Sequence, residues 1–136
     1  MKALIAFDGS AEADRAVDWV ARSGSFTNAT VLGVGPAPSL RHGRRRRGRP
    51  FSNRPGWSSS EELNAAVGRL SAAGVDATGE DKGGNVVKSI VEAAEKGDFD
   101  VVVVGSRRRH MKWRILFGST AEKIVRRAPI DVVVVR

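Results

Sequence analysis

The sequence predicts an α/β fold, a doubly wound parallel sheet of five strands with helices on both faces. Short apolar runs rich in β-branched residues alternate along the chain with segments whose apolar residues repeat at helical spacing. Such alternation favours right-handed crossovers between parallel strands that helices cover on both faces. The chain has 136 residues, the length of one domain, so we expect residues 1–136 to form a single unit.

The five predicted strands differ in polarity. Four of them are continuous apolar runs, which is typical of strands buried on both faces of a parallel sheet. They are Ala3–Phe7, Ala29–Val34, Val101–Val104 and Ile130–Val135. The fifth candidate, Asp76–Glu80, carries enough polar residues to indicate an edge strand.

Four helices are predicted between these strands, from apolar residues that follow the i, i+3, i+4, i+7 pattern. Each pattern is preceded by residues suited to cap a helix N-terminus: Ser10, the run Ser58–Ser60, Asn85 and Ser119. Glu122, three residues after Ser119, completes a capping box. Gly74 and Gly97 follow the second and third patterns, where a C-terminal glycine is expected.

The net charge of +8 is unevenly distributed along the chain. Residues 41–54 hold seven arginines, and residues 107–114 hold four arginines and one lysine, with no acidic residue in either segment. The other residues carry 11 basic and 15 acidic side chains, so their net charge is −4. The sequence therefore describes a mildly acidic domain with two basic segments, which indicates either an anionic partner or solvated loops.

The composition disfavours several classes of protein. The sequence has no cysteine, which removes disulfides, thiolate metal sites and a cysteine nucleophile. No apolar run approaches the roughly 20 residues of a membrane helix, and Ala3–Phe7 is too short for the core of a signal peptide. We therefore expect a cytoplasmic protein that does not enter a membrane.

We expect no catalytic residues and no metal site, and hence no enzyme. His42 and His110 lack acidic partners at the spacing of metal ligands. Neither a Ser-His-Asp triad nor a pair of catalytic carboxylates can be assigned. Lys88-Ser89 lacks the preceding glycine that lets a P-loop wrap around phosphates.

Ligands of doubly wound sheets bind beyond the carboxyl ends of the strands, where the strand order reverses. The segments that follow strands are Asp8–Ser10, Gly35–Trp57 and Gly105–Phe117. Asp8-Gly9-Ser10 is either a tight turn capped by Ser10 or part of a ligand site. Gly118-Ser119-Thr120 is either a helix cap or a phosphate-binding helix N-terminus, and Gly105 would let a ligand approach the backbone. Their common place at one edge of the sheet favours a ligand site there.

These motifs resemble those of the universal stress protein family, whose UspA-like domain has a Rossmann-like fold. The opening Ala6-Phe7-Asp8-Gly9-Ser10 is similar to the first strand and turn of the family. Val101–Ser106, Gly118-Ser119-Thr120 and Ala128–Val135 resemble its C-terminal half in order and spacing. The resemblance covers the whole chain except residues 35–57, and it implies a stress-response protein.

The resemblance also implies a bound nucleotide, ATP or AMP, with Mg²⁺ accompanying ATP. ATP-binding members carry a Gly-x2-Gly-x9-Gly-Ser/Thr loop; here Gly105 and Gly118-Ser119 fill its first and last positions, and Arg108 replaces its second glycine. Arg108 adds a side chain where backbone approaches the ligand, but its guanidinium group is suited to binding phosphates. The nucleotide-binding residues that the resemblance implies are Asp8, Val34, Val104, Gly105, Arg108, Gly118, Ser119 and Thr120.

Three functions stay open on the sequence. The first is a protein that senses ATP or AMP by binding it, without strong catalysis. The second is a family member that has lost nucleotide binding through Arg108 and acts by association, since the family commonly forms homodimers through its last strand, here residues 130–135. The third is a nucleic-acid or polyanion binder that uses residues 41–57, where arginines are interleaved with Phe51 and Trp57. The competing interpretation of residues 36–57 is a disordered, solvated insertion.

Overall fold

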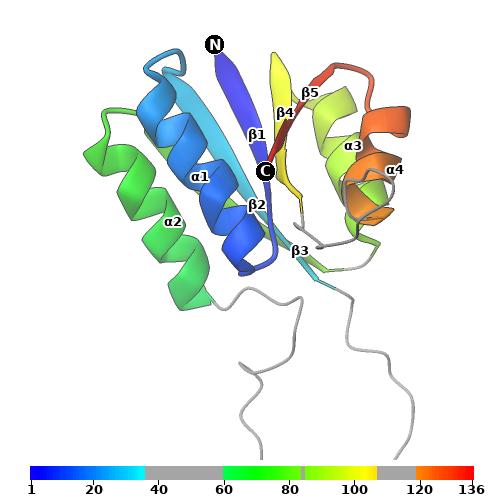
Figure 1. Ribbon diagram of the computed structural model, residues 1–136, viewed down its shortest axis with the longest axis horizontal. Helices are drawn as coiled ribbons and strands as arrows, with labels where there is room; N and C mark the ends of the chain where they lie inside the picture. The colour runs from blue at the N-terminus through cyan, green and yellow to red at the C-terminus, as the bar shows by residue number, and fades with distance from the viewer. Residues whose placement is uncertain (36–59, 84, 107–118) are drawn as a thin grey trace, which may run out of the picture.

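The computed structural model describes residues 1–35, 60–83, 85–106 and 119–136 of the chain (Figure 1). The described residues form five strands and four helices in alternating order. The strands are β1 (Lys2–Phe7), β2 (Asn28–Gly35), β3 (Asp76–Gly83), β4 (Val101–Gly105) and β5 (Asp131–Val135). The helices are α1 (Ala11–Ser23), α2 (Ser60–Ala72), α3 (Val86–Lys96) and α4 (Ser119–Arg127). None of these described helices is long and apolar enough to span a bilayer.

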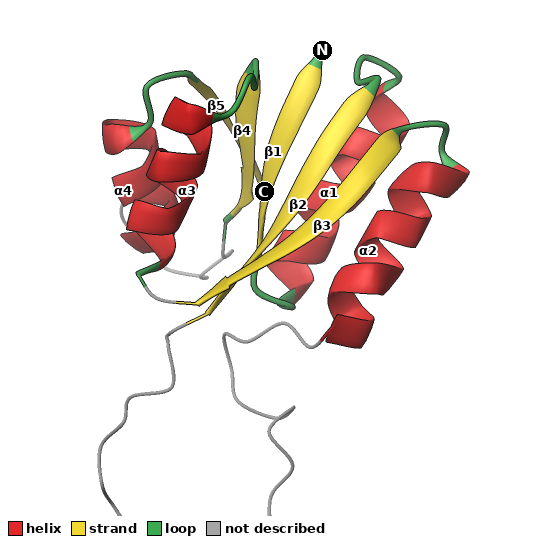
Figure 2. Ribbon diagram, turned by 180° about the vertical axis from the view of Figure 1, so that it is seen from behind, coloured by secondary structure: helices red, strands yellow, loops and turns green. Residues whose placement is uncertain are grey.

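The five strands run parallel in one sheet, in the order β3-β2-β1-β4-β5. Figures 1 and 2 show α1 and α2 on one face of this sheet, and α3 and α4 on the other. The strand order reverses between the neighbours β1 and β4, because β1 leads into α1 on one face and β4 leads into α4 on the opposite face. The predicted doubly wound, five-stranded parallel α/β fold is therefore confirmed.

Alternate residues of the same strands pack the two faces of the sheet. In the central strand β1, Ala3, Ile5 and Phe7 belong to the core beneath α1 and α2. Leu4 and Ala6 belong to the core beneath α3 and α4. All five side chains are at most 8% exposed. A strand that is buried on both faces gains from an apolar residue at every position, which explains the continuous apolar runs in the sequence.

The edge strand β3 departs from this pattern, as its polar sequence predicts. Asn28 Nδ2 of β2 donates a hydrogen bond to Asp76 Oδ2 of β3 at 3.3 Å, and the hydroxyl oxygens of Thr30 and Thr78 lie 3.3 Å apart in a second hydrogen bond. Figure 2 shows that none of the described helices lies in front of this part of β2 and β3. The helices on this side therefore cover the sheet incompletely, and polar pairs take the place of an apolar surface there.

The element boundaries differ from the predictions by a few residues. Pairing with β2 carries β3 to Gly83, beyond the predicted end at Glu80. Strand β5 begins at Asp131 rather than at Ile130. Ser119, which was expected to precede the last helix as its cap, is instead the first residue of α4. A displacement of one residue lies within the range over which helix ends vary.

Candidate functional site

The carboxyl ends of β1 and β4 mark the point at which the strand order reverses. Figure 1 shows these ends at the lower side of the sheet, where α1 and α4 also begin. Connections that diverge to opposite faces at such a point leave room for a ligand in doubly wound folds. The predicted site residues that lie at this edge, among those described, are Asp8, Val34, Val104, Gly105, Ser119 and Thr120.

The turn between β1 and α1 has the geometry that the Asp8-Gly9-Ser10 sequence predicts. Asp8 Oδ1 accepts a hydrogen bond from the Ser10 N–H at 2.9 Å, and Gly9 has a φ of 77°, which favours glycine. Ser10 Oγ accepts a hydrogen bond from the Ala13 N–H at 3.2 Å and so caps α1. The prediction of a tight turn is confirmed. The Asp8 side chain, partly exposed, also remains at the edge of the sheet, since Phe7 pairs with Gly33 immediately before it.

Val34 and Val104 are buried near the ends of the two strands that flank β1. Val34 is 3% exposed at the end of β2, and Val104 is 5% exposed near the end of β4. Both belong to the core that faces α3 and α4, together with Ala6 of the intervening strand β1. At the carboxyl edge, the partly exposed carboxylate of Asp8 therefore lies next to strands whose apolar side chains are packed in the core.

Gly105 lies against the backbone of α1. A methyl group at this position would overlap the carbonyl group of Glu12 and would lie 3.0 Å from the Ala13 nitrogen. The absence of a side chain at Gly105 thus allows the end of β4 to meet the first turn of α1. The sequence suggested that this glycine admits a ligand to the backbone, and the structure gives it a partner within the protein as well.

Ser106 and Arg15 also meet at this edge, although sequence reasoning did not select them as site residues. Ser106 is 4% exposed; its N–H donates to the Val135 carbonyl at 2.8 Å, and its carbonyl accepts a hydrogen bond from Arg15 Nη2 at 3.2 Å. Arg15 and Ser106 are 91 positions apart in the sequence. The spacing of residues along the chain cannot predict a contact between such distant positions. In the sequence, nothing distinguishes Arg15 from an arginine on the exposed face of a helix.

Helix α4 begins at the same edge with Ser119 and the exposed residue Thr120. Ala121, which follows, is 2% exposed and packs in the same core as Val34 and Val104. The first N–H groups of a helix have no intrahelical acceptors, and they favour an anionic ligand. Arg108 and Gly118, the other two predicted site residues, lie outside the described residues, as does the basic segment 41–57.

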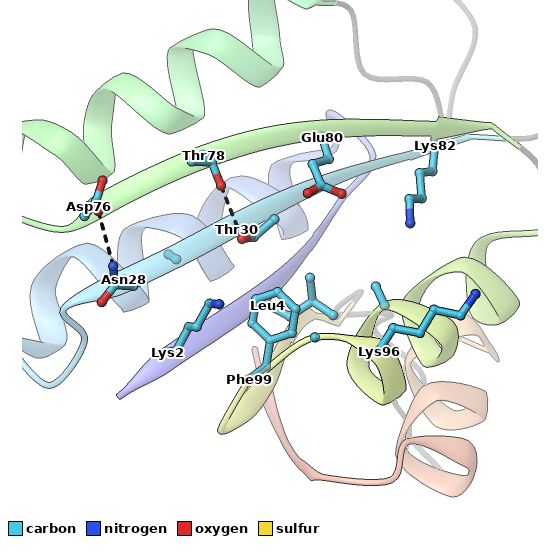
Figure 3. A pocket seen from close by; sticks show the side chains of 13 residues that line it. Lys2, Leu4, Asn28, Thr30, Asp76, Thr78, Glu80, Lys82, Lys96 and Phe99 are labelled. Atoms are coloured by element: carbon cyan, nitrogen blue, oxygen red, sulfur yellow. Dashed lines mark hydrogen bonds between the residues drawn. The ribbon is translucent and has the colours of Figure 1, made fainter.

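A concave region lies on the uncovered part of the sheet, away from the carboxyl edge of β1 and β4 (Figure 3). This open groove has a volume of about 490 Å³ and runs between β2, β3 and the C-terminal end of α3. Its charged lining residues have mixed signs: Lys2, Lys82, Lys96, Asp76 and Glu80. Because the Asn28–Asp76 and Thr30–Thr78 pairs already satisfy much of its polar floor, we do not assign a site there. Within the described ranges, no group of three or more His, Cys, Asp or Glu residues is placed to hold a metal ion.

Comparison with known proteins identifies a family over the whole chain. The model of the universal stress protein family matches residues 1–136. A universal stress protein from Archaeoglobus fulgidus is similar in structure, with a TM-score of 0.71 at 21% identity over 100% of this chain and 93% of that one. A universal stress protein in complex with cAMP has a TM-score of 0.64 at 26% identity, over 100% of this chain and 96% of that one. A universal stress protein family protein from Arabidopsis thaliana with AMP bound has a TM-score of 0.67 at 18% identity, over 99% and 90% of the two chains. Comparison with curated proteins gave no match.

Proposed function

Because the chain belongs to the universal stress protein family, we propose that it binds an adenine nucleotide, AMP or ATP, at the carboxyl edge of its sheet. The observation that carries this proposal is the meeting of Asp8, Val34, Val104 and the start of α4 where the strand order reverses. Structures described as complexes with cAMP and with AMP exist for similar proteins, which supports an adenine nucleotide as the ligand class. The protein would then act as a sensor in a stress response, through binding rather than strong catalysis.

The described residues fit the adenosine part of such a ligand. One oxygen of Asp8 accepts the Ser10 N–H, and within the described part of the chain the other carboxylate oxygen has no hydrogen-bond partner. That oxygen is an acceptor for the hydroxyl or amino groups of a nucleoside. Val34 and Val104 lie near the ends of the two strands that flank β1, so their main-chain groups would adjoin the base while their side chains pack in the core. We therefore assign Asp8 and the two valines to the adenosine end.

The phosphates are assigned to the other side of the edge. The N–H groups at Gly118, Ser119 and Thr120 would receive them at the start of α4, with Gly105 near the ribose or the first phosphate. Arg108 replaces a glycine of the family loop, and we assign its guanidinium group to the phosphates as well. When ATP is the ligand, Mg²⁺ would neutralise part of the phosphate charge. No step of bond cleavage is assigned to any residue.

The nucleotide proposal predicts that the purified protein carries or binds an adenine nucleotide. Heat-denatured protein is expected to release AMP or ATP, which chromatography identifies. Protein stripped of ligand is expected to melt at a higher temperature with AMP or ATP, because a ligand at 100 times its Kd adds about 2.7 kcal/mol to the free energy of unfolding. Guanosine monophosphate is the matched control for the base. Absence of released nucleotide, together with no thermal shift at millimolar AMP or ATP, would contradict the proposal.

Strand β5 pairs on one side only among the described residues, which favours a second function, association into a homodimer through residues 130–135. Strand β5 ends the sheet order, and its residues Val132 to Val135 are only partly buried although all are valine. A second copy of the strand would extend the sheet and cover these side chains. Light scattering is expected to give about twice the chain mass of 14.6 kDa. A mass of one chain that does not change with protein concentration would exclude this dimer.

Residues 41–57 carry a third proposal, the binding of nucleic acid or another polyanion in the cytoplasm. Its support is the charge distribution, since the basic residues are concentrated in two segments of an otherwise acidic chain. Fluorescence anisotropy with a single-stranded oligonucleotide is expected to show binding that weakens steeply as salt increases. No binding at low salt would remove this proposal and leave residues 36–57 as a solvated insertion.

A further inference from the structure

The first two turns of α1 hold the end of β4 at several points. Gly105 meets the backbone of Glu12 and Ala13 so closely that no side chain fits between them. One residue later, the Ser106 carbonyl accepts a hydrogen bond from Arg15 Nη2 at 3.2 Å. Figure 1 shows α1 beginning at the same edge at which β1 and β4 end. The start of α1 and the end of β4 are therefore fixed relative to each other.

Arg15 makes the only side-chain hydrogen bond to this end of β4 among the described residues. Its guanidinium group also lies 4.0 Å from Glu12 Oε1, and its Nε is buried without a partner in the described part of the chain. The Ser106 N–H donates to Val135 on the other side, at 2.8 Å. The Ser106 peptide is thus held between α1 and β5, immediately before the segment that leads to Arg108 and Gly118. The guanidinium group of Arg15 is a charged donor, and a hydrogen bond from a charged donor is stronger than a neutral one of the same geometry.

We propose that Arg15 is a positioning residue of the nucleotide site, which orients the backbone of Gly105 and Ser106 at the end of β4. This inference rests on the proposed nucleotide-binding function. Arg15 does not touch the nucleotide; it lowers the cost of ordering the backbone that does. Affinity gained in this way comes from preorganisation rather than from an added contact with the ligand.

Arg69 provides a matched control on the same helix pair. Arg69 Nη1 donates to Asp18 Oδ1 of α1 at 3.0 Å, and Arg69 Nη2 pairs with Asp14. Its side chain is 39% exposed, compared with 38% for Arg15, and its Nε is likewise buried without a partner among the described residues. Arg69 therefore links α1 to α2, whereas Arg15 links α1 to β4. Replacing either removes a similar arginine, but only one replacement frees the Ser106 carbonyl.

The test compares the AMP affinity, melting temperature and hydrogen exchange of the wild-type protein with those of Arg15→Gln, Arg15→Lys and Arg69→Gln. Arg15→Gln is expected to bind AMP about tenfold more weakly, because the backbone of Gly105 and Ser106 must then be ordered on binding. Arg15→Lys keeps the positive charge and is expected to recover part of this loss. Arg69→Gln is expected to change the affinity by less than about twofold, since it lies away from the site, although it lowers the melting temperature to a similar degree. In Arg15→Gln alone, the Ser106 amide is expected to exchange faster.

The possible results distinguish a failure of the proposed role of Arg15 from a failure of the proposed nucleotide binding. If the wild-type protein binds neither AMP nor ATP, the proposed function and the inference both fail. If the wild-type protein binds AMP but Arg15→Gln and Arg69→Gln lose affinity equally, or Arg15→Gln loses none, the inference alone is overturned. If Arg15→Gln does not fold, the AMP affinities of Arg15→Lys and Arg69→Lys are compared instead. Weaker binding by Arg15→Lys alone then supports the inference, and equal binding by both overturns it.

Discussion

Gly105→Ala is expected to lower the free energy of unfolding by about 3 kcal/mol, at the upper end of the usual cost of an overpacked residue. The added methyl group would overlap the carbonyl group of Glu12, and backbone cannot move aside as a flexible side chain can. Either α1 must shift away from β4 or the end of β4 must leave the sheet. Both changes disturb the core formed by Ala13 and Val103 on this face. Urea denaturation followed by circular dichroism measures the loss.

Gly68→Ala is the control for the effect of removing a glycine. Gly68 lies within α2, and a methyl group there would have no atom within 4 Å among those described. Alanine favours a helix over glycine by roughly 1 kcal/mol, so this variant is expected to be slightly more stable than the wild-type protein. If Gly105→Ala unfolds at the same urea concentration as the wild-type protein, the close contact between β4 and α1 is wrong.

Asp8→Asn is expected to weaken the binding of AMP by at least about tenfold while leaving the stability nearly unchanged. The asparagine oxygen can still accept the hydrogen bond from the Ser10 N–H, so the turn keeps its geometry. The negative charge that we assign to the adenosine end is lost. Hydrogen bonds to charged groups contribute roughly 1.5–3 kcal/mol, and about 1.4 kcal/mol corresponds to a tenfold change in Kd. Isothermal titration with AMP measures the affinity, and thermal denaturation measures the stability.

Asp98→Asn removes the same charge at an exposed position after α3 and is the matched control. It is expected to bind AMP as the wild-type protein does. An unchanged affinity in Asp8→Asn would remove Asp8 from the site without affecting the family assignment. A large loss of stability in Asp8→Asn would instead show that the charge itself holds the turn.

Most of the fold follows from the sequence, because the strands are buried on both faces. Burial on both faces requires apolar residues at consecutive positions, so Val101–Val104 is recognisable as a strand without any knowledge of its partners. The polar residues of Asp76–Glu80 likewise predict an edge, and β3 lies at the edge. The role of Ser10 as the N-cap of α1 is also predictable from the sequence, because a cap bonds to an N–H only three residues further along the chain.

The candidate site is predicted less completely, because it depends on contacts between distant segments. Glycine at position 105 has two explanations, a ligand or a neighbouring chain segment, and only the structure shows Glu12 beside it. The link from Arg15 to Ser106 joins two elements that periodicity and capping treat separately. The incomplete cover of β2 and β3 also depends on where α3 crosses the sheet, which helical spacing does not specify.

Strand β1 lies at the centre of the sheet, between β2 and β4. Because β4 and β5 come last in the chain, one side of β1 cannot be paired until they have been synthesised. The first half of the chain supplies β1, β2 and β3 with α1 and α2, which cover one face only. The apolar residues of the other face, among them Leu4 and Leu32, stay in contact with water until β4 and the helices beside it have been made. Exposed apolar surface of this kind makes partly folded chains prone to aggregate. We therefore expect folding of this protein to be completed late, and its N-terminal half to be the part most prone to aggregate during synthesis.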